Sequence, residues 1–378
     1  MLNLEIVRAP LPSDQDYQTI FAEYTRLTRA CIAERYMHRW CKDGPAGPAL
    51  HALLRTDEGK IAGHACIFPF PIEVNGKKQT AGKGEYLFVH EKLRREPVRG
   101  MEACSLHPSV LMLRQLYRHA TEQLSWDPIL ISAIPGVDKI HQLAGCRLMT
   151  LPLFECLLIR KPWSACRFTP NLSRAKRLAL LLLGLPQTCI WAVVRPLLLR
   201  RSRDLTSLPM TQATRIENGG LRIERNQSLD CDPPSSMHHP PSARFSSDPD
   251  YLSWRYPAEG FERFGFANRP NSYVITQKGS PRNYLRICQS NLDSLDFPVL
   301  SLIVGLMGQA RSSHALGVRW AIYDNGRPPA AIVNKLKRLG FACVRRQRNV
   351  LIYTRQQELA NSSRWSFDDS LVAFENHY

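Results

Sequence analysis

The chain has 378 residues, of which 44% are hydrophobic and 22% are charged. Its length exceeds what a single hydrophobic core usually supports, so we expect two domains, and its composition excludes disordered and fibrous proteins. Fifty Lys and Arg against 33 Asp and Glu give a net charge of +17, which favours a negatively charged partner such as CoA phosphates, anionic lipid or nucleic acid.

The cysteines and the N-terminus bear on the compartment. There are 11 cysteines, an odd number, and none forms a C-x-x-C pair. This pattern argues against a disulfide framework and against a zinc site, so no metal is expected. The N-terminus lacks the basic start and apolar run of a secretory signal. A cytoplasmic protein in a reducing compartment is therefore predicted.

The first half alternates turn signals with apolar runs. Asp57-Glu58-Gly59 separates two such runs, and Asn75-Gly76 favours a tight hairpin turn because both residues tolerate positive φ. Apolar residues at three- and four-residue spacing indicate helices on either side of this meander. The expected elements are helices over 14–41, strands over 50–56 and 60–74, a strand running toward Val89, a helix over 110–124, a strand over 128–133, a helix over 137–144 and a strand over 151–159.

The second half repeats this plan in looser form. After a strand over 221–225, the Pro/Ser-rich stretch 228–247 predicts an exposed loop. The last residues, 359–378, are expected to form a tail. The elements expected between them are strands over 261–266, 272–276 and 283–288, a helix over 298–311, a strand over 318–323, a helix over 328–339 and a strand over 349–354.

A basic, leucine-rich segment joins the halves. No acidic residue stands between Cys156 and Arg203, and the run 178–194 is uncharged. Pro186-Gln187 interrupts that run, which disfavours a membrane span. Two readings remain. Helices within 174–203 lie on the anionic inner face of the membrane, or they pack between the halves with their arginines in solvent.

Particular residues then resemble the GNAT acyl-CoA N-acyltransferase superfamily. Val89 to Arg94 is similar to the V-x-P-x-x-R that ends the family's fourth strand, and 141–146 and 336–341 are similar to its L-x-x-x-G-F helix ending. Trp254-Arg255-Tyr256 resembles a signature of tandem GNAT proteins found with bacterial exopolysaccharide and capsule genes. The resemblance covers about 20–160 and 220–355. It implies an α/β (α+β) fold of two GNAT-like modules, each a mixed, mostly antiparallel sheet flanked by helices.

The resemblance also implies an acyl-CoA site in the first module, with acetyl-CoA or another acyl-CoA as co-substrate. Strand four would part from its neighbour over 86–89 and pair with the pantetheine arm, while the loop 94–100 would hold the pyrophosphate. That loop has Glu96-Pro97 where the family has small glycines, so Arg95 and Arg99 are expected to replace missing backbone contacts. The implied cofactor-binding residues are Leu87, Phe88, Val89, Arg94, Arg95, Arg99 and Gly100.

For the chemistry, an acyltransferase takes a proton from the amine and returns one to the thiolate. The resemblance makes Glu85 the candidate base, and it makes His141 the candidate acid, with His90 nearby as a second candidate. The second module has Asp293 and Asp296 where a pyrophosphate would bind, so it is expected to be degenerate. Its Trp254-Arg255-Tyr256 either stacks on a ligand or packs in the core.

Two functions stay open at this point. One is an N-acyltransferase acting on a small amine, such as an amino-sugar in polysaccharide biosynthesis. The other is a catalytically inactive scaffold or binding protein at the inner membrane face. Nucleic-acid binding is disfavoured because leucines, not stacking aromatics, accompany the basic residues. The predicted domains are 1–165, a connector over 166–215, a second module over 216–358 and the tail.

Overall fold

The computed structural model describes most of the two predicted modules. The described residues are 1–11, 13–28, 41, 44–132, 136–168, 205–208, 243–246, 248–256, 260–266, 269–277, 284–290, 299–323 and 330–367, with scattered positions between 173 and 189. The predicted strand over 221–225, most of the loop over 228–247 and much of the connector lie outside them.

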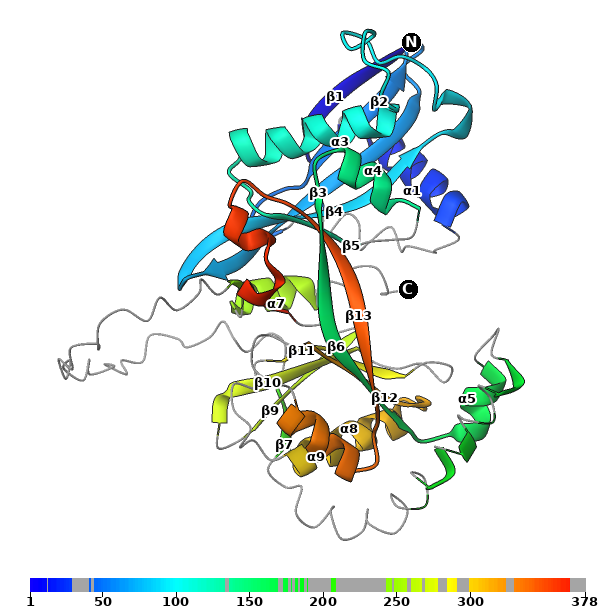
Figure 1. The fold of residues 1–378 in the computed structure, drawn as a ribbon, viewed down its shortest axis with the longest axis vertical. Coiled ribbons are helices and arrows are strands. Elements are labelled where there is room, and N and C mark those ends of the chain that lie inside the picture. The colour runs from blue at the N-terminus through cyan, green and yellow to red at the C-terminus, as the bar shows by residue number, and fades with distance from the viewer. Residues whose placement is uncertain are drawn as a thin grey trace, which may run out of the picture.

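The described elements of the first half follow the predicted order, and residues 29–40 of the helices predicted over 14–41 lie outside the described residues (Figure 1). Asn75 and Gly76 make the hairpin turn with φ of 52° and 74°, the left-handed conformation that tight hairpins need. Pro108 begins the main helix, where its missing N–H costs nothing. The bounds are β1 (Leu2–Arg8), α1 (Asp14–Thr28), β2 (Leu50–Thr56), β3 (Ile61–Val74), β4 (Lys77–Val89), η1 (Glu91–Leu93), α3 (Pro108–Arg118), β5 (Ile129–Ser132), α4 (Asp138–Leu143), β6 (Arg147–Ile159) and α5 (Pro162–Phe168).

The second half repeats the succession of the first. A meander of three strands leads to a helix, a strand parallel to the third, a second helix and a long last strand. The bounds are β9 (Phe261–Phe266), β10 (Arg269–Gln277), β11 (Leu285–Ser290), α8 (Val299–Ser312), β12 (Gly317–Tyr323), α9 (Ala330–Arg338) and β13 (Ala342–Tyr353). Shorter elements are β7 (Leu205–Leu208), β8 (Ala243–Phe245), α7 (Pro249–Arg255) and β14 (Trp365–Ser366). The prediction of two modules on one plan is confirmed.

The two halves exchange their last strands. β13 pairs with β5 through Val350–Tyr353, and β6 pairs with β12 through Leu153–Ile159. β6 and β13 also pair with each other along most of their length, and in Figure 1 they cross together from the upper half to the lower. The result is one continuous mixed sheet in the order β1-β2-β3-β4-β5-β13-β6-β12-β11-β10-β9-β7. β13 is longer than the predicted strand over 349–354 because it serves both halves.

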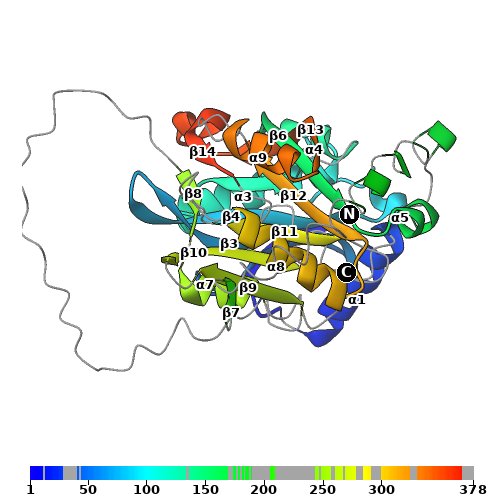
Figure 2. The same cartoon turned by 90° about the horizontal axis from the view of Figure 1, so that it is seen from below.

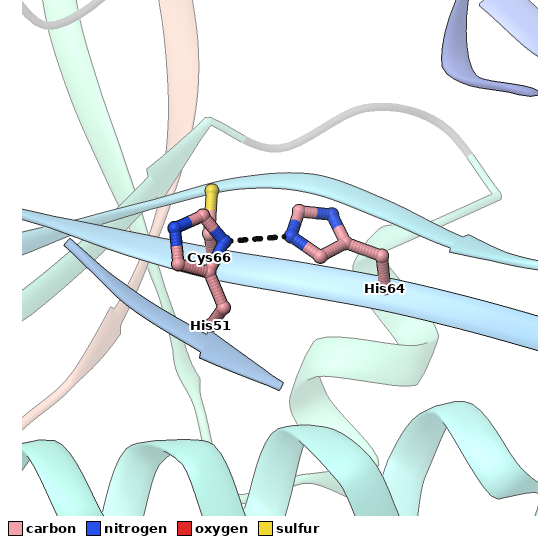
Figure 3. A group of neighbouring side chains, drawn as sticks. All are labelled: His51, His64 and Cys66. Carbon is pink, nitrogen blue, oxygen red and sulfur yellow. Dashed lines mark hydrogen bonds between the residues drawn. The ribbon is translucent and has the colours of Figure 1, made fainter. Parts of the chain in front are cut away.

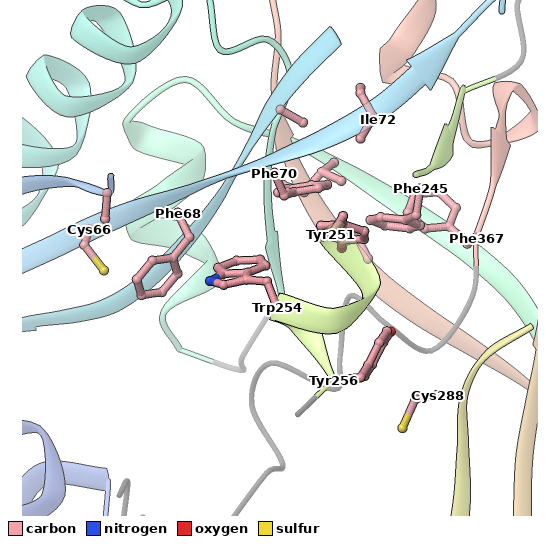
Figure 4. Packing of buried hydrophobic residues seen from close by; sticks show 14 of the residues in the cluster. Cys66, Phe68, Phe70, Ile72, Phe245, Tyr251, Trp254, Tyr256, Cys288 and Phe367 are labelled. Carbon is pink, nitrogen blue, oxygen red and sulfur yellow. The ribbon is translucent and has the colours of Figure 1, made fainter. Parts of the chain in front are cut away.

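Buried side chains form separate outer cores and one shared inner core. One outer core lies between the first sheet and α3 with α4, and another lies between the second sheet and α8 with α9. The inner core joins the halves: Phe68 and Phe70 of β3 lie beside Trp254 of α7, and Tyr256 lies near Cys288 of β11 (Figure 4). The halves are therefore joined by buried apolar contacts as well as by shared strands.

Part of the predicted tail belongs to this inner core. Leu359, Trp365 and Phe367 are buried, and the indole N–H of Trp365 donates to the carbonyl of Leu359 at 2.8 Å. β14 pairs with β8 at one end of the molecule (Figure 2). Residues 359–367 are thus a packed extension, held by aromatic burial, and 368–378 lie outside the described residues. Within the described residues, no helix is long and apolar enough to cross a membrane.

Candidate functional site

β4 and β5 part where the resemblance places the cofactor. Among described residues their pairing is limited to Gly82 with Ile129 and Lys83 with Leu130. On its other side β4 stays paired with β3 up to Val89, but a bulge interrupts that ladder at Tyr86, whose φ is 54°. A bulge of this kind bends a strand and turns it away from its neighbour. We call the segment Leu87–Val89 the free edge of β4.

The backbone direction of this edge follows from two hydrogen bonds. The amide of His90 donates to the carbonyl of Ala62 in β3 at 2.8 Å, so the backbone groups of His90 point toward β3. Because these groups alternate along a strand, those of Leu87 and Val89 point to the opposite side, toward the parted neighbour. The Arg94 guanidinium confirms this, since its Nε lies 3.5 Å from the carbonyl of Val89. Phe88, by contrast, pairs with His64 in β3.

Glu85 stands two residues before the free edge and forms an ion pair with Lys83. Its Oε1 lies 2.5 Å from the Nζ of Lys83, which is fully buried, whereas the side chain of Glu85 is 10% exposed. The same ammonium donates to Ser132 Oγ at the end of β5, at 3.3 Å. Lys83 therefore spans the point where the strands separate. The sequence signal for it was a lysine between two glycines just before the candidate base.

The loop 94–100 leads away from the free edge. The carbonyl of Pro97 accepts from the amide of Leu2, and Val98 pairs with Leu2 in β1, the edge strand three places from β4. Arg99 pairs there with Asp57 at 2.8 Å, and the Gly100 amide donates to Glu102 at 2.8 Å. Arg95 is exposed. The structure thus places the Arg99 guanidinium beside β1 and Asp57, and the replacement of cofactor contacts by Arg95 and Arg99 stays a prediction.

The N-terminus of α3 is capped by the protein itself. His107 Nδ1 accepts from the amide of Ser109 at 3.1 Å, and the His107 carbonyl accepts from the amide of Val110. Burial and the nearby charge of Arg94 lower the pKa of His107, which keeps the imidazole a neutral acceptor. Arg94 is thus the predicted cofactor residue that lies near both α3 and the free edge.

The two candidate acids lie in different surroundings. His141, expected to be an exposed helix residue or an acid, is buried at 5% exposure, with its Nδ1 2.6 Å from the Tyr117 hydroxyl. Burial and the charge of Lys83 lower its pKa to about 4, so it is neutral at pH 7 and a poor proton donor. Instead it joins α4 to α3. His90 follows β4 directly and precedes η1, half-buried.

The aromatic signature of the second module packs in the core. Trp254, Arg255 and Tyr256 are all buried, and the Arg255 guanidinium lies 5.2 Å from the Tyr256 ring centroid. This agrees with the packing interpretation and leaves no exposed ring for stacking on a ligand. Asp293 and Asp296 lie outside the described residues.

Comparison with known proteins bears on the fold. No protein-family model matches the chain, and no curated protein matches its sequence. Among solved structures it is similar to a conserved protein of Enterococcus faecalis V583 described as a probable N-acyltransferase, with a TM-score of 0.54 and 10% identity over 95% of this chain and 74% of that one. It is also similar to a GCN5-related N-acetyltransferase from Kribbella flavida, with a TM-score of 0.52 and 10% identity over 93% and 72%.

The chain has the GNAT fold. The similarity spans 95% of the chain and so covers both halves. At such low identity the similarity establishes the arrangement of strands and helices, and the activity rests on the residues described above.

Proposed function

We propose that the chain is an acyl-CoA-dependent N-acyltransferase whose active site lies in the first half. The observation that carries the proposal is the free edge of β4, where the peptide groups of Leu87 and Val89 face away from β3, beyond the last described pairing with β5. Peptide groups at an open strand edge can form further hydrogen bonds. The amide groups of a pantetheine arm can provide the partners, as an added β-strand does.

Three side chains then have roles in this proposal. Arg94, beside α3 and the carbonyl of Val89, would bind the pyrophosphate. Glu85, beside the free edge, would accept the proton of the amine. As the amine nitrogen bonds to the thioester carbon, the carbon–sulfur bond breaks and CoA leaves as the thiolate. Lys83 would hold Glu85 in position.

A second candidate, the inactive scaffold, is favoured by two specific contacts. Lys83 already engages the Glu85 carboxylate in an ion pair, and His107 occupies an amide of α3 that a phosphate would otherwise use. In each case the protein itself already pairs a group that a bound substrate or cofactor would need: the Glu85 carboxylate and the amide of Ser109.

The acceptor and the location are finer proposals. An amino-sugar in polysaccharide biosynthesis fits the resemblance of the sequence. Association with an anionic membrane is supported by exposed apolar side chains next to the basic segment: Trp163 is 68% exposed, and Leu178, Leu182 and Leu185 are exposed at helical spacing. Pelleting with anionic but not neutral vesicles would support it, and equal recovery in both supernatants would contradict it.

Calorimetry with acetyl-CoA separates the transferase from the scaffold. The wild-type chain should bind, and Arg94→Ala should bind about tenfold or more weakly, since a charge-assisted hydrogen bond contributes about 1.5–3 kcal/mol. Arg99→Ala is the matched control, because it removes the same charge from a guanidinium paired with Asp57. It should bind like the wild type. Absence of heat with any acyl-CoA would leave the scaffold.

A further inference from the structure

Three metal-ligating side chains meet inside the first half, away from the residues assigned above. His51 comes from β2 and His64 and Cys66 from β3, and His51 stands directly opposite Cys66 in the pairing of the two strands. All three side chains therefore point to one face of the sheet (Figure 3). Their ligand atoms lie within 4.8 Å of one another, and each residue is buried.

The hydrogen bonds fix how the imidazoles are arranged. His64 Nδ1 lies 3.2 Å from the carbonyl of Tyr86, an acceptor, so it carries the hydrogen and leaves the lone pair on Nε2. That lone pair faces His51 Nδ1 at 3.0 Å (Figure 3). Nε2 of His51 is buried and has no hydrogen-bond partner among the described residues. One ring nitrogen of the buried His51 imidazole is therefore left without a hydrogen bond from the described residues, which is uncommon for a buried polar atom.

We propose that His51, His64 and Cys66 bind a divalent transition-metal ion of the zinc type. Two imidazoles and a thiolate form a donor set that suits Zn²⁺ and its tetrahedral relatives such as Co²⁺. The metal takes the place of the hydrogen shared by His51 Nδ1 and His64 Nε2. In a tetrahedral site those atoms stand about 3.3 Å apart, given Zn–N bonds of about 2.0–2.1 Å, so the present 3.0 Å separation needs little opening.

Metal binding requires that two protons change place. Cys66 gives its thiol proton to solvent as its sulfur binds the metal, and the Nδ1 hydrogen of His51 moves to Nε2. Cys41 is a second buried thiol in the same core cluster, and its charge acts on Cys66. The sequence argued against zinc because no C-x-x-C is present. Strand pairing brings these donors together without that spacing.

The position of the site indicates a structural metal. His64 contacts the carbonyl of Tyr86 at the β4 bulge, and Cys66 Sγ lies 3.7 Å from the carbonyl of Glu85. An ion there would fasten β2 and β3 behind the free edge of β4. All three ligand residues are buried, as is usual for structural zinc sites. The proposal is independent of acyl transfer.

Cobalt spectroscopy on the full chain tests it. After chelator treatment and dialysis, one equivalent of Co²⁺ should produce tetrahedral d–d bands and a thiolate-to-cobalt charge-transfer band. Cys66→Ser should lose the charge-transfer band, and His64→Gln should weaken binding at least tenfold. Cys146→Ser is the matched control, since Cys146 is also a buried thiol, beside Tyr117. It should keep both bands.

Any of the following results would contradict the proposed metal site. A wild-type chain that gives no tetrahedral cobalt spectrum has no such centre, whatever the variants do. A charge-transfer band that survives in Cys66→Ser, or that disappears equally in Cys146→Ser, assigns the signal to other thiols. Circular dichroism of each variant, compared with the wild type, shows whether a lost band reflects a lost ligand or a lost fold.

Discussion

Glu85 is both the proposed base and a member of a buried ion pair. Its carboxylate must accept a proton while Lys83, 2.5 Å away, holds it in place. Glu85→Gln keeps the shape and removes the base, so kcat should fall about 10²–10⁴-fold, while the Kd for acetyl-CoA stays within about twofold. The rate is measured as release of the CoA thiol from acetyl-CoA in the presence of an amine acceptor. Glu58→Gln, which removes an exposed carboxylate paired with Lys60, should change neither value. A Glu85→Gln chain as fast as the wild type would exclude this base.

His141 predicts how stability depends on pH. Its pKa is about 4 when folded against an ordinary value of 6.5, so the unfolded chain binds the proton more readily. The stability due to neutral His141 is thus present above about pH 6.5 and is lost as pH falls toward 4. Between pH 7 and 4.5 the loss amounts to about 2–3 kcal/mol.

The variant His141→Asn keeps an acceptor for Tyr117 but cannot titrate. Urea denaturation at pH 7 and pH 4.5 should show a smaller acid-induced loss of unfolding free energy for this variant than for the wild type, by about 2 kcal/mol. His314→Asn, at an exposed position, should keep the wild-type dependence. Parallel profiles for His141→Asn and the wild type would contradict the buried neutral imidazole.

At the scale of elements, the contact between β12 and the exchanged β6 is very close. A Cβ at Gly317 would lie 2.0 Å from the carbonyl oxygen of Leu158 and 3.0 Å from the Cα of Ile159. Gly317→Ala should therefore force the strands apart and lower the unfolding free energy by about 3 kcal/mol or more. Chemical denaturation measures it.

Gly308 supplies the control within the same half. A Cβ there meets nothing within 4 Å, and the residue lies inside α8. Gly308→Ala should leave stability unchanged or raise it by up to about 1 kcal/mol, because alanine loses less entropy in a helix. If both alanine variants behaved alike, the tight β6–β12 contact would be refuted.

Local patterns explain why most elements were predictable. Asn75-Gly76 specifies its turn by backbone conformation alone, and the apolar spacing of α3 specifies which face is buried. Each signal lies within about 15 residues. The strand over 349–354 was predicted too short, because the residues of β13 that pair with β6 are largely polar and exposed and show no apolar alternation.

The site was less predictable because its contacts are not local. Glu85 and its partner Lys83, two residues away, follow from the position of β4, but the contact of Lys83 with Ser132 depends on where β5 ends. The path of 94–100 to β1 depends on backbone bonds to Leu2. His51 and Cys66 become neighbours only through the pairing of β2 with β3. No spacing along the chain encodes these distances.

For the molecule as a whole, strand exchange predicts that the halves cannot fold separately. A fragment 1–165 lacks β13, so β5 would present an open edge and Leu151 and Leu153 would lose their shared core. Expressed alone it should be insoluble or unfolded by circular dichroism. Co-expressed with 166–378 it should elute as a 1:1 complex in size-exclusion chromatography. A folded, monodisperse 1–165 would disprove this dependence.

The same exchange sets the order of events while the chain is being made. Ser132 in β5 pairs with Val350 in β13, 350 − 132 = 218 residues later. At a synthesis rate of about 5–20 residues per second, the ribosome needs roughly 10–40 s to deliver that partner. During this interval the nascent first half carries an unclosed sheet, which makes it a natural client for chaperones until its last strand emerges.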